Sequence, residues 1–203
     1  MFKIAVLVSG GGTNLQAIIN AIKNKKLHNC KIEIVISNNQ KAFALERAKK
    51  NNIDNIVICK KDYANVNDEI TKILDNKKID LVVLAGYLSI LEGKILKKYK
   101  NKIINIHPSL IPSFCGKDMY GLKVHDAIIK SGVKVTGCTV HYVNEGIDQG
   151  AIILQEVMKI NDDDTSETLQ KRLLKLEHKS LIKTIDLISK NKIEIFQNKT
   201  KLK

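Results

Sequence analysis

Tryptophan is absent from this 203-residue sequence, and aromatic residues make up only 4% of it. Only two of the 34 basic residues are arginine, Arg47 and Arg172, and all the others are lysine. Proteins that bind nucleic acid favour arginine for bidentate contacts and aromatic rings for stacking on bases. The scarcity of both argues against a nucleic-acid partner, although the net charge is +13. A solvated, lysine-rich surface is the simpler interpretation of that charge.

Long apolar runs are also missing. The longest run, residues 79–84, is interrupted by Asp80, whereas a membrane-spanning helix needs about 18 to 20 apolar residues. The four cysteines are scattered without a CxxC pair, so neither a zinc site nor a disulfide framework is indicated. We therefore expect a protein with no membrane segment and no metal, in the reducing environment of the cytoplasm.

Short apolar runs alternate with helical periodicity through the first half of the chain. Strands are predicted at residues 3–9, 31–37, 55–59, 80–85 and 103–106, with helices between them. The strands are continuously apolar, which is typical of a parallel sheet covered on both faces. The prediction is an α/β fold with a Rossmann-like, mostly parallel sheet and helices on both faces.

The second half of the chain has a different pattern. It predicts a helix over residues 122–131, strands over 135–143 and 151–160, and a long helix that follows Thr165 as its N-cap. A last short strand is expected at 192–196, and a flexible basic tail at 197–203. No linker or repeat divides the chain, so we expect a single domain over residues 1–203.

A glycine-rich turn, SGGGTN at residues 9–14, joins the first predicted strand to the first helix. Glycines leave backbone amides exposed, and a helix N-terminus carries a partial positive charge, so the turn is suited to bind phosphate. The P-loop pattern is absent, and Leu15 stands where a dinucleotide fingerprint has its third glycine. The alternative interpretation is an ordinary turn between a strand and a helix.

Asn105 and His107 lie two residues apart at the end of a predicted strand, so their side chains point to the same side. An amide donor and an imidazole can together stabilise an oxyanion and transfer a proton. Pro108 and Pro112, the only prolines, follow His107. We expect a catalytic pair here rather than a structural histidine. The glycines and Lys117 of residues 112–121 suit that loop to be a mobile lid.

Asp148 lies in a turn between Gly146 and Gly150. A carboxylate beside an imidazole raises the imidazole pKa and orients the ring, so Asp148 is the candidate partner of His107. On its own, an aspartate in such a turn is usually a turn residue. His141 is either a core histidine or a supporting group. The other three histidines, His28, His125 and His178, are expected to be peripheral.

Several segments occur in an order typical of one known family: SGGGTNLQAI, SNNQKAFALERAK, LAGYLSIL, INIHPSLIPSFCGKDMYG, TGCTVHYV and DQGAIILQ. With these segments the chain resembles the folate-dependent phosphoribosylglycinamide formyltransferases over roughly residues 3–190. The resemblance implies the formyltransferase fold. It also implies transfer of a formyl group from 10-formyltetrahydrofolate to glycinamide ribonucleotide in purine biosynthesis, without a metal. The partners would be these small molecules alone, with no nucleic acid or membrane, and the enzyme would be a monomer or homodimer.

The resemblance also implies roles for individual residues. Asn105, His107 and Asp148 would be catalytic, with Asp148 keeping His107 protonated. The phosphate would be held by Gly12, Thr13 and Asn14, the ribose by Glu177, and the cofactor by Leu88, Ser89, Ile90, Leu91, Asn105 and Val143.

Two departures from the family pattern concern the folate. The family usually has arginine at the position of Ser89 and in the stretch 63–66, where this chain offers only Lys60 and Lys61 nearby.

Three alternatives remain at this point. Formyltetrahydrofolate hydrolases and methionyl-tRNA formyltransferases share the NIHPSL element but carry an additional domain. A basic nucleic-acid-binding module is the non-enzymatic alternative, and it gives no role to Asn105, His107 and Asp148.

Overall fold

The computed structural model of the protein describes all 203 residues, which fall into two units, Met1–Asn105 and Ile106–Lys203. We refer to them as unit 1 and unit 2 and describe each by itself. The single domain expected from the sequence stays a prediction.

Unit 1 is built on five parallel strands in the order β3-β2-β1-β4-β5. The strands are β1 (Phe2–Val8), β2 (Cys30–Ser37), β3 (Asn55–Val57), β4 (Leu81–Leu84) and β5 (Ile103–His107), the last of which continues into unit 2. Residues 4–8 of the central strand β1 are fully buried. Because β1 is covered on both faces, its sequence is continuously apolar, as predicted.

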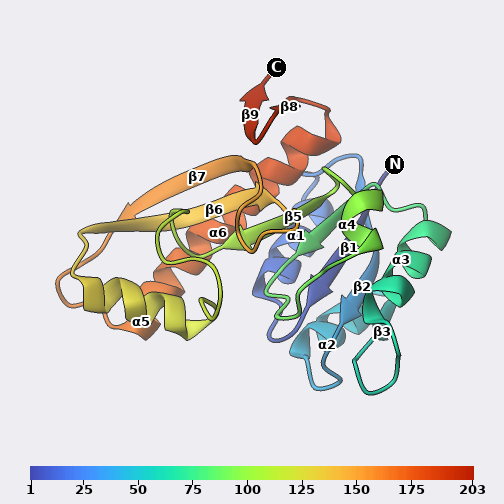
Figure 1. Ribbon diagram of the computed structural model, residues 1–203, viewed down its shortest axis with the longest axis horizontal. Coiled ribbons are helices and arrows are strands. Elements are labelled where there is room, and N and C mark those ends of the chain that lie inside the picture. The colour runs from blue at the N-terminus through green and yellow to red at the C-terminus, as the bar shows by residue number, and fades with distance from the viewer. The chain divides into compact units, whose positions relative to one another are not determined.

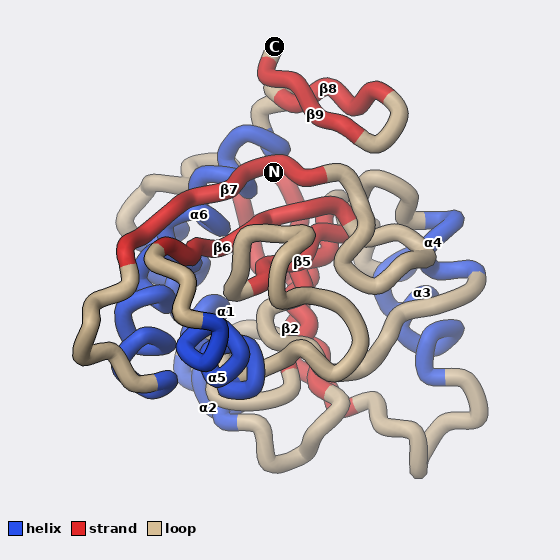
Figure 2. The backbone as a smooth tube through the Cα atoms, turned by 60° about the vertical axis from the view of Figure 1, so that its left-hand side comes forward, coloured by secondary structure: helices blue, strands red, loops and turns tan.

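Helices cover both faces of these strands. They are α1 (Thr13–Lys23), α2 (Phe43–Lys50), α3 (Val66–Asn76) and α4 (Lys94–Lys98). Helices α1 and α2 pack together on one side, and α3 and α4 pack together on the other (Figure 2). The predicted Rossmann-like arrangement is confirmed in unit 1, where the carboxyl ends of the strands carry the loops that the sequence marked as functional.

Unit 2 combines a mixed set of strands with two helices. Its elements are α5 (Leu122–Ser131), β6 (Val135–Tyr142), β7 (Ile152–Lys159), α6 (Ser166–Ser189), β8 (Ile193–Phe196) and β9 (Lys199–Leu202). Strand β6 is antiparallel to β7, and the long helix α6 packs against β6, β7 and α5 (Figure 1). Thr165 caps α6 through a reciprocal pair of hydrogen bonds with Thr168, so the predicted N-cap is confirmed.

The C-terminal residues differ from the expectation. Residues 199–202, expected in a flexible basic tail, form β9, which pairs with β8 in a hairpin and meets β7 at Ile152. The Thr200 hydroxyl also donates to the Ile152 carbonyl at 2.8 Å. Backbone pairing, rather than burial of apolar side chains, holds this lysine-rich segment. No helix of the chain combines the length and the apolar run that a membrane crossing requires.

Candidate active site

The carboxyl ends of β1, β2 and β4 are joined by hydrogen bonds in unit 1. Ser9, which follows β1, donates its N–H to the Gly86 carbonyl at 3.1 Å, and its hydroxyl accepts from the N–H of Leu88 at 2.8 Å. The side chain of Asn39, which follows β2, donates to the Ser9 carbonyl at 3.2 Å. The glycine-rich turn and the segment 86–91 are therefore parts of one connected edge of the sheet.

The glycine-rich turn leads directly into α1. Gly12, the N-cap residue, has left-handed backbone angles of φ 69° and ψ 38°, which a residue with a side chain rarely adopts. No side chain caps the helix, and its first turn contains no acid. The first amides of α1, at Thr13 and Asn14, therefore add their partial positive charge to a turn without a carboxylate of its own.

The segment predicted to contact the folate presents both exposed and buried residues. Leu88 and Ile90 are 60% and 64% exposed, whereas Leu91 is 5% exposed. The Ser89 hydroxyl accepts a hydrogen bond from the Asn38 side chain at 2.7 Å. Two large apolar side chains exposed on one short segment are suited to contact a flat aromatic ligand, and Asn38 fixes the residue between them in the sequence.

Strand β5 carries Asn105 and ends at His107, whose side chain is buried. The Nε2 atom of His107 lies 2.9 Å from the carbonyl oxygen of Phe114. A carbonyl only accepts, so Nε2 carries the hydrogen and donates it. The other ring nitrogen, Nδ1, faces the Asp148 carboxylate, with 3.7 Å between Nδ1 and Oδ2. The structure therefore brings His107 and Asp148 together, as expected.

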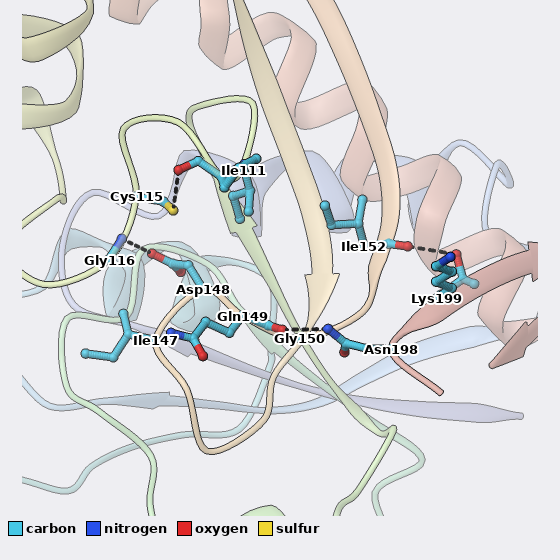
Figure 3. Close-up of a pocket in the computed structure, with 12 residues that line it drawn as sticks. Ile111, Cys115, Gly116, Ile147, Asp148, Gln149, Gly150, Ile152, Asn198 and Lys199 are labelled. Carbon is cyan, nitrogen blue, oxygen red and sulfur yellow. Dashed lines mark hydrogen bonds between the residues drawn. The ribbon is translucent and has the colours of Figure 1, made fainter. Parts of the chain in front are cut away.

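Asp148 is held in a left-handed turn, with φ 56°. Its Oδ2 accepts a hydrogen bond from the N–H of Gly116 at 2.9 Å (Figure 3), and its Oδ1 lies 3.5 Å from Nε2 of His141. The Nδ1 atom of His141 donates to the Tyr142 carbonyl at 2.8 Å. The carboxylate therefore lies between two imidazoles and a backbone amide.

In this cluster, burial shifts the pKa of each group in one direction, and its hydrogen bonds and neighbouring opposite charges shift it in the other. Burial lowers the pKa of His107 below its usual 6.5, although the Phe114 carbonyl and the Asp148 charge act in the other direction. This differs from the expectation that Asp148 keeps His107 protonated. Burial destabilises the charged imidazolium more than the Asp148 carboxylate, 3.7 Å away, stabilises it. Burial raises the pKa of Asp148, but the groups around it outweigh burial and hold it below 3.8.

An open pocket of about 810 Å³ lies beside Asp148 in unit 2 (Figure 3). It is lined by Ile111, Pro112, Cys115, Gly116, Ile147, Asp148, Gln149, Gly150, Ile152, Asn198, Lys199 and Thr200. The Asn198 side chain donates to the Gln149 carbonyl at 3.1 Å, which ties the β8–β9 hairpin to the turn that carries Asp148. The C-terminal hairpin thus supports the site, a role that the sequence did not indicate.

The other residues predicted to bind substrate or folate in unit 2 are Glu177 and Val143. Glu177 is a buried residue of α6, and Val143 is half-buried just after β6. Sequence reasoning left His141 undecided, and it did not identify Phe114 or Gly116. Phe114 and Gly116 act through a backbone carbonyl and a backbone N–H, which every sequence position has, so nothing in the sequence marks them.

Comparison with known proteins identifies the family. The Formyl transferase family profile matches residues 2–185. The chain belongs to the formyl transferase family. It is 39% identical over 196 residues to the trifunctional purine biosynthetic protein adenosine-3 of Gallus gallus, covering 95% of this chain and 19% of that protein. It is 34% identical to the chloroplastic phosphoribosylglycinamide formyltransferase of Arabidopsis thaliana, covering 95% of this chain and 67% of that protein.

Solved structures show the same family fold. Glycinamide ribonucleotide transformylase 1 from Symbiobacterium toebii has 36% sequence identity and a TM-score of 0.93, covering 100% of this chain and 94% of its own. A formyltetrahydrofolate deformylase from Pseudomonas syringae has 27% identity and a TM-score of 0.89, covering 99% of this chain and 65% of its own. The α/β formyltransferase fold predicted from the sequence is therefore confirmed. The chain spans only about a fifth of the trifunctional relatives.

Proposed function

We propose that the chain transfers a formyl group from 10-formyltetrahydrofolate to the amine of glycinamide ribonucleotide. The observation that carries this proposal is the cluster at the end of β5, where Nδ1 of buried His107 faces the Asp148 carboxylate. Membership in the formyl transferase family supports formyl transfer as the reaction, and the names of the relatives support glycinamide ribonucleotide as the substrate.

The reaction needs one proton to move between two nitrogens. The glycinamide amine attacks the formyl carbon, a new C–N bond forms, and the formyl oxygen becomes an oxyanion. The bond from carbon to N10 then breaks, the amine gives up a proton, and N10 of the folate receives one. Formyl glycinamide ribonucleotide and tetrahydrofolate are the products, so neither a metal nor a redox step enters this scheme.

The contact of the His107 ring with the Phe114 carbonyl supports different roles for its two ring nitrogens. Nε2 is engaged with the Phe114 carbonyl, so Nδ1 is the nitrogen that gains and loses the proton. In this scheme Nδ1 of His107 accepts the proton that the amine releases, and the lowered pKa of His107 favours this role as a base. Asp148 then stabilises the imidazolium, and the Asn105 amide stabilises the oxyanion.

The substrate-binding residues keep the roles that the family resemblance implies. Gly12, Thr13 and Asn14 bind the phosphate at the α1 N-terminus, and Glu177 accepts hydrogen bonds from the ribose. The folate is bound by Leu88, Ser89, Ile90, Leu91, Asn105 and Val143. The exposure of Leu88 and Ile90 supports this assignment.

Hydrolysis of the formyl group is the second candidate, favoured by the likeness to a formyltetrahydrofolate deformylase. The two activities separate in one assay, in which purified protein receives 10-formyltetrahydrofolate with or without glycinamide ribonucleotide. A transferase consumes the folate only when the amine is present and produces formylated ribonucleotide. Consumption that is independent of the amine and releases formate would replace this proposal with hydrolysis.

A further inference from the structure

The carbonyl groups of the glycine-rich turn are bound by helix α2 within unit 1. The N–H of Ala44, in the first turn of α2, donates to the Gly10 carbonyl at 3.1 Å. Arg47, less than one turn later, donates from Nε to the Gly11 carbonyl at 2.8 Å. Two consecutive carbonyls of the turn are therefore directed toward α2.

Arg47 is itself held by two further contacts. Its Nη1 donates to the Gln16 side chain of α1 at 3.0 Å, and its guanidinium lies 4.9 Å from the centre of the Phe43 ring. The planar guanidinium thus contacts the turn, α1 and α2 at the same time. A lysine ammonium on a flexible stem lacks the rigid fork that makes these contacts together.

Because the peptide group is planar, the direction of these carbonyls also fixes the direction of the neighbouring amides. In a planar trans peptide, a carbonyl and the N–H of the next residue point in opposite directions. With the Gly10 and Gly11 carbonyls on α2, the amides of Gly11 and Gly12 point away from α2. Together with the first amides of α1 they form a row of donors, and such a row binds an anion.

The turn and α2 also touch without room between them. A Cβ atom added at Gly12 would lie 2.6 Å from the Cβ and 2.9 Å from the Cα of Ala44. The backbone of the turn therefore rests directly on α2, and the arrangement tolerates little displacement.

We propose that Arg47 is a positioning residue for the phosphate site. It orients the peptide between Gly11 and Gly12 so that the Gly12 N–H is presented to the phosphate, and it acts through that peptide rather than by touching the phosphate. This inference rests on the proposed function, in which the turn binds the phosphate of glycinamide ribonucleotide.

Kinetics of Arg47→Lys and Arg47→Gln test this role. We expect both variants to raise the KM for glycinamide ribonucleotide about tenfold, the effect of losing a hydrogen bond to a charged donor. The kcat and the KM for 10-formyltetrahydrofolate should change less than about twofold. Arg172→Gln, which removes the other arginine from α6 in unit 2, is the matched control and should leave all three constants unchanged.

Two outcomes of these kinetics would overturn the proposal. Full recovery by Arg47→Lys would show that only the charge matters, and a parallel rise of both KM values would show a general disturbance of unit 1. If the Arg47 variants fold poorly, Gln16→Met removes one tether of the guanidinium, and we expect about a threefold rise in the same KM. An unchanged KM in that variant would count equally against the proposal.

Binding measured by nuclear magnetic resonance separates this role from the proposed function. Ribose 5-phosphate, titrated into ¹⁵N-labelled protein, should shift the amides of Gly11, Gly12 and Thr13, with a midpoint about tenfold higher in Arg47→Lys. Equal midpoints would refute the positioning role and leave the phosphate site intact. If these amides respond to neither ribose 5-phosphate nor glycinamide ribonucleotide in the unmodified protein, the phosphate site is wrong and the positioning role falls with it.

Discussion

The Asp148 carboxylate is in contact with the Gly116 amide and with two imidazoles, those of His107 and His141. Asparagine has the same shape and can still accept a hydrogen bond from Gly116, but it carries no charge to stabilise an imidazolium. Replacing Asp148 by asparagine therefore removes the electrostatic role while leaving the turn in place.

For Asp148→Asn we expect kcat to fall about a hundredfold or more, the usual contribution of acid–base catalysis, with little change in the KM for the ribonucleotide. The Asp148 charge raises the pKa of His107, so its loss should move the acidic limb of the pH–rate profile to lower pH. Asp162→Asn, at an exposed aspartate of unit 2, is the control. A variant with unchanged kcat would remove Asp148 from the mechanism.

His125 gives a residue-scale prediction about stability. It was expected to be peripheral, but it is a buried residue of α5, and its Nδ1 atom has no hydrogen-bond partner. Burial lowers the pKa of His125 from 6.5 to about 4, although the charge of Asp126 opposes the shift. Between these two values the unfolded chain binds a proton that the folded chain does not, so stability falls as pH falls below 6.5.

Between pH 7.5 and 5.0 we expect His125 alone to account for a loss of about 2 kcal/mol in the free energy of unfolding. Urea denaturation of the protein and of His125→Leu at both pH values measures it, and the variant should lose correspondingly less. Exposed His28, replaced by asparagine, is the control that should follow the unmodified protein. Identical losses in all three proteins would show that His125 does not titrate in this way.

At the scale of elements, the β8–β9 hairpin supports the turn that carries Asp148. Asn198 lies between the two strands of the hairpin, and its side chain holds the Gln149 carbonyl. We expect Asn198→Ala to lower kcat about fivefold, since one hydrogen bond is worth roughly 1 kcal/mol, without altering the KM for the ribonucleotide. Lys201→Ala, on β9, is the control. Equal kcat values for both variants would mean that the hairpin does not influence the turn.

The predictability of the elements follows from what stabilises each of them. Buried strands such as β1 and β4 are apolar throughout, so the sequence indicates both their position and their parallel arrangement. Strand β9, KTKL, is mostly exposed and held by backbone pairing. A strand held in this way has no apolar pattern, which is why its residues were expected to form a tail.

The same reasoning applies to the candidate site. The pairing of His107 with Asp148 could be anticipated because an imidazole at the end of a strand needs an acidic partner, and Asp148, in a turn between Gly146 and Gly150, offers one. The state of His107 could not, because its pKa depends on how deeply the ring is buried and on the Phe114 carbonyl. Side-chain chemistry is visible in a sequence, but burial and backbone contacts arise only in the folded chain.

At the scale of the whole molecule, the net charge of +13 acts on both proposed substrates, because phosphate and the folate glutamate tail are anionic. Raising the ionic strength from about 0.01 M to 0.1 M shortens the Debye length from about 30 Å to 10 Å. We expect kcat/KM for both substrates to fall over this range, most steeply for a polyglutamylated folate. The cytoplasmic location and the monomeric or homodimeric state stay predictions.

Lys60 and Lys61 should carry much of that effect for the folate, because they are exposed and lie next to the stretch where the family usually has arginine. Lys60→Gln/Lys61→Gln should reduce the preference for polyglutamylated over monoglutamylated folate about threefold and flatten its salt dependence. Lys25→Gln/Lys26→Gln removes the same charge from another exposed turn of unit 1 and is the matched control. If both double variants lose the preference equally, the whole basic field attracts the tail. If neither loses it, charge plays no part, and the lysines are a solvated surface alone.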